Sequence, residues 1–241
     1  MNYFNNIKDY NVQYILNFLQ TNPAKNSTLL FNSEKEREIK FSSEITILHS
    51  YSQETLFIKQ CLKNKIPAVE INNKNFLQKL KNIKTPYCLL AFGQDSVIVN
   101  DLTNSFIDTF KSLKIPFCFC GSLLPISRLP IETTVTLTIP GNSKYLNSNL
   151  VFGYTKEIIR FYEFVNKACG MDVFLGENQS QRILLYFSLV KYFANILPEI
   201  IDSQQKLFST ISLDTYDLFE LDKDTRIVSK HVQIPFSDFL F

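Results

Sequence analysis

Short apolar runs alternate with segments of helical periodicity between residues 44 and 120. The runs are typical of buried strands, and an apolar residue every three or four positions is typical of a helix with one buried face. The expected strands are "EITILHSY", "IPAVEI", "PYCLLAF" and "IPFCFC", and the expected helices are "SQETLFIKQCLKN", "NKNFLQKLKNI" and "NDLTNSFIDTFKSLK". This order predicts an open, mostly parallel α/β sheet with helices packed on it. We expect Asn100 or Asp101 to cap the last of these helices.

Two regions flank this alternating pattern. Residues 1–43 are expected to form an N-terminal helical extension, "IKDYNVQYILNFLQ", and a charged linker, "NSEKEREIKF". Later in the chain we expect a strand in "ETTVTLTI", a polar loop in "PGNSKYLNSN", helices in "TKEIIRFYEFVNKA" and "ENQSQRILLYFSLVKYFANI", and short strands in "FSTISL", "DLFEL" and "RIVSKHVQI". No clear linker or repeat interrupts residues 44–241, so we predict one domain there.

Composition excludes several classes of function. The net charge of +2 is too small to indicate an electrostatic nucleic-acid binder, although a local basic patch stays open. The six glycines form neither of the phosphate-binding motifs G-x-G-x-x-G and G-x-x-x-x-G-K-[ST]. No uninterrupted apolar run approaches the roughly 20 residues that a membrane helix needs. We therefore expect no nucleic-acid partner and no membrane span.

The five cysteines indicate the cellular compartment. Four lie within apolar runs, and Cys118 and Cys120 are too close together for a Cys-x-x-Cys zinc hook. We expect buried, reduced thiols, which are typical of cytoplasmic proteins. The N-terminus lacks the pattern of a signal peptide. Abundant Asn, Lys, Ile and Phe indicate an AT-rich genome, so the expected location is the cytoplasm, or a virus particle if the source is viral.

Polar residues end three of the expected strands. They are "HSY" at 49–51, "GQD" at 93–95 and "CGS" at 120–122. Parallel strands end at the same edge of a sheet, and the ligands of open α/β sheets bind beyond those ends. We therefore expect these residues to converge on one crevice.

Four stretches occur in an order that matches one enzyme family. They are "CLLAFGQDSVIVNDLTNSFIDTFKSLKIPFCFCGS", "YLNSNLVFGYTKEIIRFYEFV", "GENQSQRILLYFSLVKYF" and "ISLDTYDLFEL". Over roughly residues 44–235 they resemble the glycosyltransferase domain of procollagen lysyl hydroxylases and their giant-virus relatives. The resemblance implies a GT-A-like (Rossmann-like) fold, in which helices flank a mixed sheet. It also implies transfer of a sugar from a uridine diphosphate (UDP) donor.

The metal site that this resemblance implies has changed in the chain. The family holds manganese at an Asp-x-x-Asp motif, where oxygen ligands and the ion neutralise the leaving diphosphate. Gln94 and Val97 stand at the two Asp positions, and a slip of one residue puts Asp95 and Ile98 there instead. Either alignment loses a ligand, so we interpret "GQDS" as a metal site without its ligands. We predict no metal and no other cofactor.

Other motifs implied by the resemblance have changed as well. "NSN" replaces Asn-Ser-Gly-Gly and leaves a side chain at Asn149, while Thr215 replaces the His of a Leu-Asp-His strand. Glu177 is the only acid where the family has an Asp-Asp pair. His231 precedes the Ile-Pro pair that would come before the family's His-Gly-Asn-Gly segment, so we interpret it as structural.

The polar strand ends and these alignments together supply the candidate site residues. The catalytic candidates are Asp95, Glu177 and Gln181. The candidates for nucleotide-sugar binding are His49, Ser50, Tyr51, Gln94, Asp95, Ser122, Asn147, Ser148 and Asn149. His49, with Tyr51, is either a platform for the uracil base or the polar end of a buried strand. Asp95 either contacts a ribose or a metal, or forms a local turn bond.

Three functions stay open. The one we favour is a glycosyltransferase-like protein that binds a UDP-sugar through a degenerate metal site, with weak or no catalysis. The second is an active metal-independent glycosyltransferase, in which Arg128, Lys144 or Arg182 stabilises the diphosphate. The third is a structural or interaction protein, such as a viral-particle component, whose aromatic-rich surface binds other protein chains.

Overall fold

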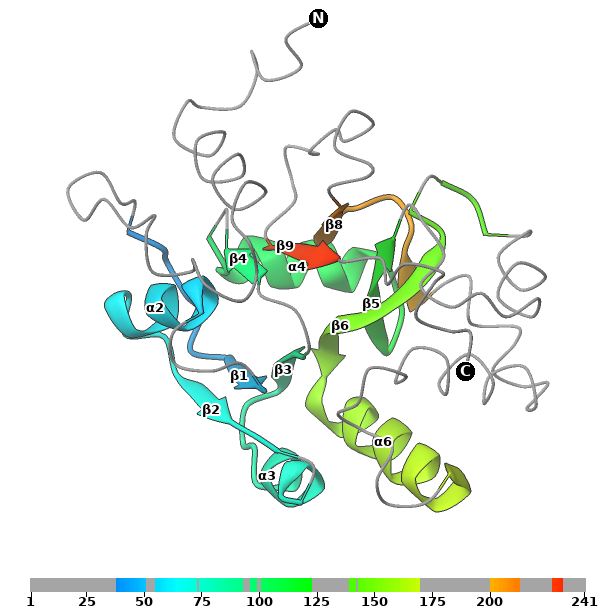
Figure 1. Ribbon diagram of the computed structural model, residues 1–241, viewed down its shortest axis with the longest axis horizontal. Helices are drawn as coiled ribbons and strands as arrows, with labels where there is room; N and C mark the ends of the chain where they lie inside the picture. The colour runs from blue at the N-terminus through cyan, green and yellow to red at the C-terminus, as the bar shows by residue number, and fades with distance from the viewer. Residues whose placement is uncertain are drawn as a thin grey trace, which may run out of the picture.

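The protein is seen in a computed structural model (Figure 1). It describes residues 38–50, 55–72, 74–92, 96–98, 101–122, 139–141, 143–169, 200–212 and 227–231. The expected helices at 7–20 and 177–196 lie outside these residues, as do the strands expected in 132–138 and 217–221. Within them, the predicted α/β fold with a mixed sheet flanked by helices is confirmed.

Among the described residues, the main sheet has six strands in the order β2-β1-β3-β6-β5-β7. They are β1 (Ile45–His49), β2 (Ala68–Glu70), β3 (Tyr87–Ala91), β5 (Phe117–Ser122), β6 (Tyr145–Tyr154) and β7 (Ile201–Asp202). β6 runs antiparallel to β3 and β5, and the other pairings are parallel. We call the edge at which the parallel strands end the carboxyl edge, and the edge at which they begin the amino edge. β6 therefore begins at the carboxyl edge.

A second sheet contains, in the part of the chain that the structure describes, three short strands in the order β4-β9-β8. They are β4 (Ser96–Ile98), β8 (Phe208–Ser212) and β9 (Ile227–His231). β4 is antiparallel to β9, whereas β8 is parallel to it. The apolar segment "YCLLA" thus forms β3 in the main sheet, whereas the next apolar segment in the sequence forms β4 in the second sheet.

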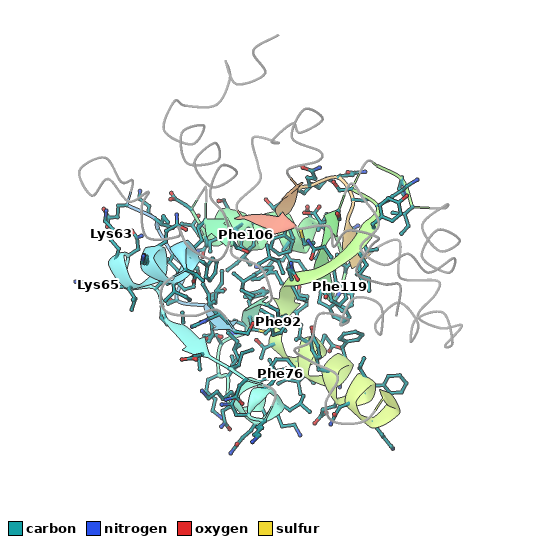
Figure 2. The ribbon with its side chains drawn as sticks, in the orientation of Figure 1. Lys63, Lys65, Phe76, Phe92, Phe106 and Phe119 are labelled. Carbon is teal, nitrogen blue, oxygen red and sulfur yellow. The ribbon has the colours of Figure 1, made fainter. Side chains whose placement is uncertain are left out.

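Helices cover both faces of the main sheet. They are α2 (Leu56–Lys63), α3 (Phe76–Lys81), α4 (Asn104–Ser112) and α6 (Thr155–Cys169). Phe57 of α2 and Phe106 of α4 belong to one buried cluster, whereas Phe76 of α3 and Tyr162 of α6 belong to the other. Figure 2 shows Phe106 and Phe76 on opposite sides of the centre of the protein. Each helix has one apolar face, so two clusters form with the sheet between them.

The start of α4 differs from the expected one. Its N-cap is Thr103, so the prediction of Asn100 or Asp101 at this position is wrong. Leu102 is fully buried and forms a parallel bridge with Phe41, which keeps the chain extended up to the residue before the cap. The helix can begin only after this bridge.

The segment "PGNSKYLNSN" also differs from its predicted structure. We expected a polar loop up to Asn149, but β6 already begins at Tyr145 and continues to Tyr154. Three of the five residues Tyr145–Asn149 are polar, yet Asn147 and Ser148 are almost completely buried between β5 and β3. A polar segment can occupy a central strand when its side chains find hydrogen bonds, which a reading of apolar pattern misses.

Gln60 fastens the second sheet to α2. This side chain is buried, and its amide makes two hydrogen bonds to the backbone of Ile98 in β4. Its Nε2 donates to the Ile98 carbonyl at 2.9 Å, and its Oε1 accepts from the Ile98 N–H at 2.9 Å. The amide therefore satisfies both backbone groups of one buried strand residue.

Replacing Gln60 by Met should destabilise the protein by about 2 kcal/mol, because two buried backbone groups of Ile98 lose their partners. Met has a similar length but neither donates nor accepts strongly. Urea unfolding of Gln60→Met beside Gln78→Met, a change at an exposed position of α3, measures the difference. Equal stability of the two variants would contradict the proposed anchoring.

Candidate functional site

The strand ends that the sequence singled out lie along the carboxyl edge. The Ser50 N–H donates to the Ala91 carbonyl at 3.0 Å, which joins the end of β1 to the end of β3. The Phe92 N–H donates to the Asn149 carbonyl at 2.7 Å, which joins the end of β3 to β6. Ser122, at the end of β5, pairs with Tyr145 at the start of β6. The backbone thus places "HS", "CGS" and "NSN" in one row along this edge.

The end of β1 carries two of the candidates. His49 is the last strand residue and is only 4% exposed, while Ser50 is half-buried. A ring this buried matches the interpretation of His49 as the polar end of a buried strand. As a platform for a base it would have to become exposed first.

The start of β6 carries three more candidates around an irregularity in the strand. The pairing of β5 with β6 shifts between Phe119 and Cys120. Within this region the Asn147 side-chain oxygen accepts a hydrogen bond from the Asn149 N–H at 3.0 Å. Asn147 thus stabilises the local backbone, whereas the side-chain amide of the half-buried Asn149 makes no hydrogen bond within the described residues. Asn149 is therefore the side chain here that has donor and acceptor groups to offer a ligand.

β7 adds a buried carboxylate that the sequence analysis did not single out. Asp202 is 4% exposed and pairs in register with Cys120 of β5. Its Oδ1 accepts from the Lys206 N–H at 2.8 Å, and its Oδ2 accepts from the N–H groups of Leu207 at 2.6 Å and Phe208 at 2.8 Å. The available signal in the sequence for this residue was an Asp directly after the apolar pair Ile200 and Ile201.

The charge state of Asp202 reflects two opposing effects. Burial raises the pKa of its carboxyl above the ordinary value, and the three backbone N–H donors offset part of that rise. Both oxygens are engaged by the turn that leads from β7 into β8. Asp202 therefore organises the backbone beside the carboxyl edge and offers no oxygen outward.

A tightly packed backbone surrounds the end of β5. A Cβ added to Gly121 would meet the carbonyl oxygen of Ser143 and lie 2.8 Å from that of Asp202. The Ser143 N–H in turn donates to the Ser203 carbonyl at 3.2 Å. Gly121 lets these three chain segments approach one another closely.

Several predicted site residues lie outside the described part of the chain. They are Tyr51, Gln94, Asp95, Glu177 and Gln181, together with Arg128 and Arg182. Lys144, the remaining candidate cation, is half-buried next to β6, and its Nζ lies 5.7 Å from the centre of the Tyr145 ring. It stands at the carboxyl edge, where the second open function would need a positive charge.

The described residues of the carboxyl edge do not by themselves fit a divalent ion. No group of three or more His, Cys, Asp or Glu side chains with the arrangement of a metal site occurs among them. The one buried carboxylate there, that of Asp202, accepts three backbone hydrogen bonds. Hard cations need several oxygen ligands directed at one point.

The described cysteine thiols are unsuited to nucleophilic chemistry. Within the described residues Cys61, Cys88, Cys118 and Cys120 form no disulfide and are buried, as expected for reduced thiols. Burial raises the pKa of Cys61 and of Cys88 to about 12, and it raises the pKa of Cys118 well above its ordinary value. The reactive thiolate is therefore strongly disfavoured at neutral pH.

Comparison with known proteins gives a fold likeness without a family. No family model matches the sequence, and no curated protein matches it significantly. Of the 112 matching chains of solved structures, one is the apo form of mouse xyloside xylosyltransferase 1. It is 8% identical, the match covers 80% of this chain and 87% of that chain, and the TM-score is 0.43. At this identity and TM-score the likeness assigns neither an activity nor site residues.

Proposed function

We propose that this chain is a glycosyltransferase-like protein, related to the UDP-sugar transferases that act on collagen lysine, which binds a UDP-sugar at its carboxyl edge and has weak or no catalytic activity. One observation carries the proposal: the ends of β1, β3 and β5 and the start of β6 lie together at this edge. The strand order reverses between β1 and β3, and ligands of open α/β sheets bind beyond the strand ends at such a reversal.

The groups available at this edge suit the neutral, hydroxyl-rich sugar and ribose of such a ligand. The Asn149 amide can both donate to and accept from a sugar or ribose hydroxyl, and Ser50 stands beside it across the end of β3. Sites of this kind orient small molecules with a few well-placed polar groups. The described carboxylate, Asp202, is already engaged with backbone, and the degenerate metal site itself stays a prediction because Gln94 and Asp95 lie outside the described residues.

Lys144 favours one alternative, an active transferase that needs no metal. A cation beside the carboxyl edge can stabilise the negative charge that develops on a leaving diphosphate. Transfer or slow hydrolysis of the sugar in the absence of metal, lost in Lys144→Gln, would favour this alternative.

Thermal unfolding with a panel of UDP-sugars, with and without manganese, tests the proposal. We expect at least one UDP-sugar to raise the melting temperature by the same amount in both conditions, because binding to the folded state stabilises it. Stabilisation that requires manganese would contradict the degenerate site. No stabilisation by any UDP-sugar would contradict nucleotide-sugar binding and favour an interaction protein.

A matched pair of variants locates the binding site. Asn149→Ala should weaken the binding of the stabilising UDP-sugar about tenfold, because it removes a hydrogen-bonding group at the carboxyl edge. Asn82→Ala makes the same change at an exposed position ahead of β3, towards the amino edge. Titration calorimetry of the two variants gives the comparison, and equal affinities would place the ligand elsewhere.

A further inference from the structure

A three-residue pattern occurs at three connections from a helix to a strand. The connections from α2 to β2, from α3 to β3 and from α4 to β5 read Lys65-Ile66-Pro67, Lys84-Thr85-Pro86 and Lys114-Ile115-Pro116. Each pattern ends directly before its strand. Because β2, β3 and β5 run in the same direction, the three lysines lie at the amino edge, opposite the candidate site.

The strand order spaces these lysines regularly. β2 and β3 are separated by one strand, and β3 and β5 are also separated by one strand. With about 4.8 Å between neighbouring strands, the three connections follow one another at intervals of roughly 10 Å. A backbone hydrogen bond holds each of them in place: the Pro67 carbonyl accepts from the Ile47 N–H at 3.4 Å, the Pro86 carbonyl from the Thr155 N–H at 2.9 Å, and the Pro116 carbonyl from the Tyr154 N–H at 3.1 Å.

The three lysines are available to a partner. Lys65, Lys84 and Lys114 are exposed, and they form no ion pair within the part of the chain that the structure describes. Lys65 and Lys114 have φ angles of 53° and 57°, in the left-handed region that glycine adopts without steric cost. The backbone alone would favour glycine at both positions, so the choice of lysine needs another reason.

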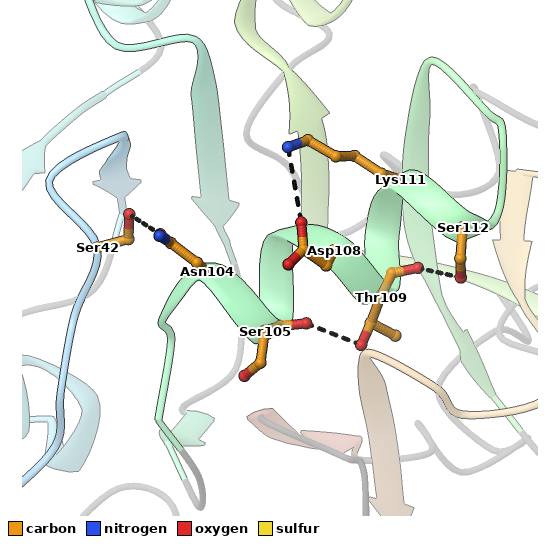
Figure 3. Close-up of polar contacts among 7 residues, drawn as sticks. All are labelled: Ser42, Asn104, Ser105, Asp108, Thr109, Lys111 and Ser112. Carbon is orange, nitrogen blue, oxygen red and sulfur yellow. Dashed lines mark hydrogen bonds and ion pairs between the residues drawn. The ribbon is translucent and has the colours of Figure 1, made fainter.

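Other charges at this edge leave it basic. Lys63, Lys111 and Lys156 lie in the helix ends that adjoin it, and all three are exposed. The described acids nearby are Glu44, Asp108, Glu157 and Glu163. Asp108 lies 3.6 Å from Lys111 (Figure 3), Glu157 pairs with Arg160, and Glu163 pairs with Lys81 in the last turn of α3. Figure 2 shows Lys63 and Lys65 projecting outward beyond the end of α2.

Two of the exposed large apolar side chains of the described residues lie at the same edge. Leu62, in the last turn of α2, is 69% exposed, and its carbonyl accepts a hydrogen bond from the Lys65 N–H. Tyr154, at the end of β6, is 37% exposed, and its ring contacts that of Tyr87 at the start of β3. Lysines beside a projecting leucine and tyrosine are typical of surfaces that rest in the headgroup region of a bilayer.

We propose that the amino edge docks on the surface of an anionic lipid bilayer, through the row of Lys65, Lys84 and Lys114 and the neighbouring Leu62 and Tyr154. The row is made of lysine, whereas arginine is preferred for recognising nucleic acids. Docking in this way requires no spanning segment, and no described helix is long and apolar enough to cross a membrane. It would leave the carboxyl edge facing away from the bilayer.

Sedimentation with vesicles tests this surface. Wild-type protein should bind vesicles of phosphatidylcholine mixed with phosphatidylserine and should not bind pure phosphatidylcholine. Added salt should weaken the binding because it screens the charges. The triple variant Lys65→Gln, Lys84→Gln, Lys114→Gln should bind roughly a hundredfold more weakly, at about 1 kcal/mol for each lysine near an anionic surface. At high salt, where the charges are screened, Leu62→Ser should bind the vesicles more weakly than wild type does.

Two matched controls separate this role from capping of the helix ends. Lys74→Gln, Lys144→Gln, Lys206→Gln removes the same charge away from the amino edge and should bind like wild type. The triple change of the row to Arg keeps its charge and should also bind. Melting curves register any loss of helix capping, which alone would not alter vesicle binding by the folded protein.

Several results would overturn the proposal. Among these are no binding of wild type to anionic vesicles, equal binding to both vesicle compositions, and an equal loss in the control triple variant. Tighter binding to an RNA oligonucleotide, with the same dependence on the row, would assign the amino edge to nucleic acid instead. None of these results bears on UDP-sugar binding at the opposite edge.

Discussion

Gly121→Ala should destabilise the protein by about 3 kcal/mol or more. The added methyl group would meet the carbonyl oxygen of Ser143 and lie 2.8 Å from the carbonyl oxygen of Asp202. Both obstacles are backbone atoms at the junction of β5, β6 and β7, so no side chain can move aside to make room. Overpacking of a well-packed core typically costs 1–3 kcal/mol, and clashes with fixed backbone belong to the upper end.

Urea unfolding measures this loss, and Cys120→Ala serves as its control. The neighbouring Cys120 is fully buried, but its change to Ala removes an atom and should cost only about 1 kcal/mol. A larger loss for Gly121→Ala than for Cys120→Ala shows that close approach of the backbone matters at this point. Similar losses would indicate that the end of β5 is merely sensitive to any change.

Asp202→Ala should lower stability by about 3 kcal/mol, because three backbone N–H groups lose their acceptor and two of these bonds are buried. Asp202→Asn keeps one acceptor oxygen and should show an intermediate loss. Chemical unfolding at neutral pH ranks wild type, Asp202→Asn and Asp202→Ala by their free energy of unfolding. An Ala variant as stable as wild type would contradict the role of Asp202 in holding the turn between β7 and β8.

The same carboxyl should give stability a pH dependence of defined sign. Its pKa is raised in the folded state, so the folded protein binds the proton more tightly than the unfolded chain does. The contribution of this group is therefore fully present below the unfolded pKa of about 3.9, and it is lost as pH rises through the folded pKa. The stability of wild type relative to Asp202→Asn should therefore fall as the pH rises from the unfolded pKa through the folded pKa. A relative stability that rises there would mean that the three N–H donors outweigh burial.

The prediction of strands and helices succeeded where one local pattern decides the outcome. "EITILHSY", "PYCLLAF" and "IPFCFC" form β1, β3 and β5, and the three periodic segments between them form α2, α3 and α4. In each case the apolar positions of one element determine which side it buries. The prediction failed for "KYLNSN" because the environment of β6 comes from β3 and β5, which are distant in the sequence.

The candidate site was predictable only in part. The order of strands and helices implied that "HSY" and "CGS" end at the same edge, and the described residues of both do so. Asp202 was missed because nothing in its immediate sequence shows that three N–H groups will surround it. The roles of Gln94, Asp95 and Glu177 stay predictions, since these residues lie outside the described part of the chain.

The amino-acid sequence alone determined the type of fold, the buried thiols and the recurrence of lysine and proline before three strands, because each is a property of consecutive residues. Tertiary structure decided the position of β6, the acceptor role of Asp202 and the need for glycine at position 121. It also decided that sugar-binding candidates and lysines lie at opposite edges. These features depend on contacts between residues far apart in the chain, and local pattern carries no information about which distant strand becomes a neighbour.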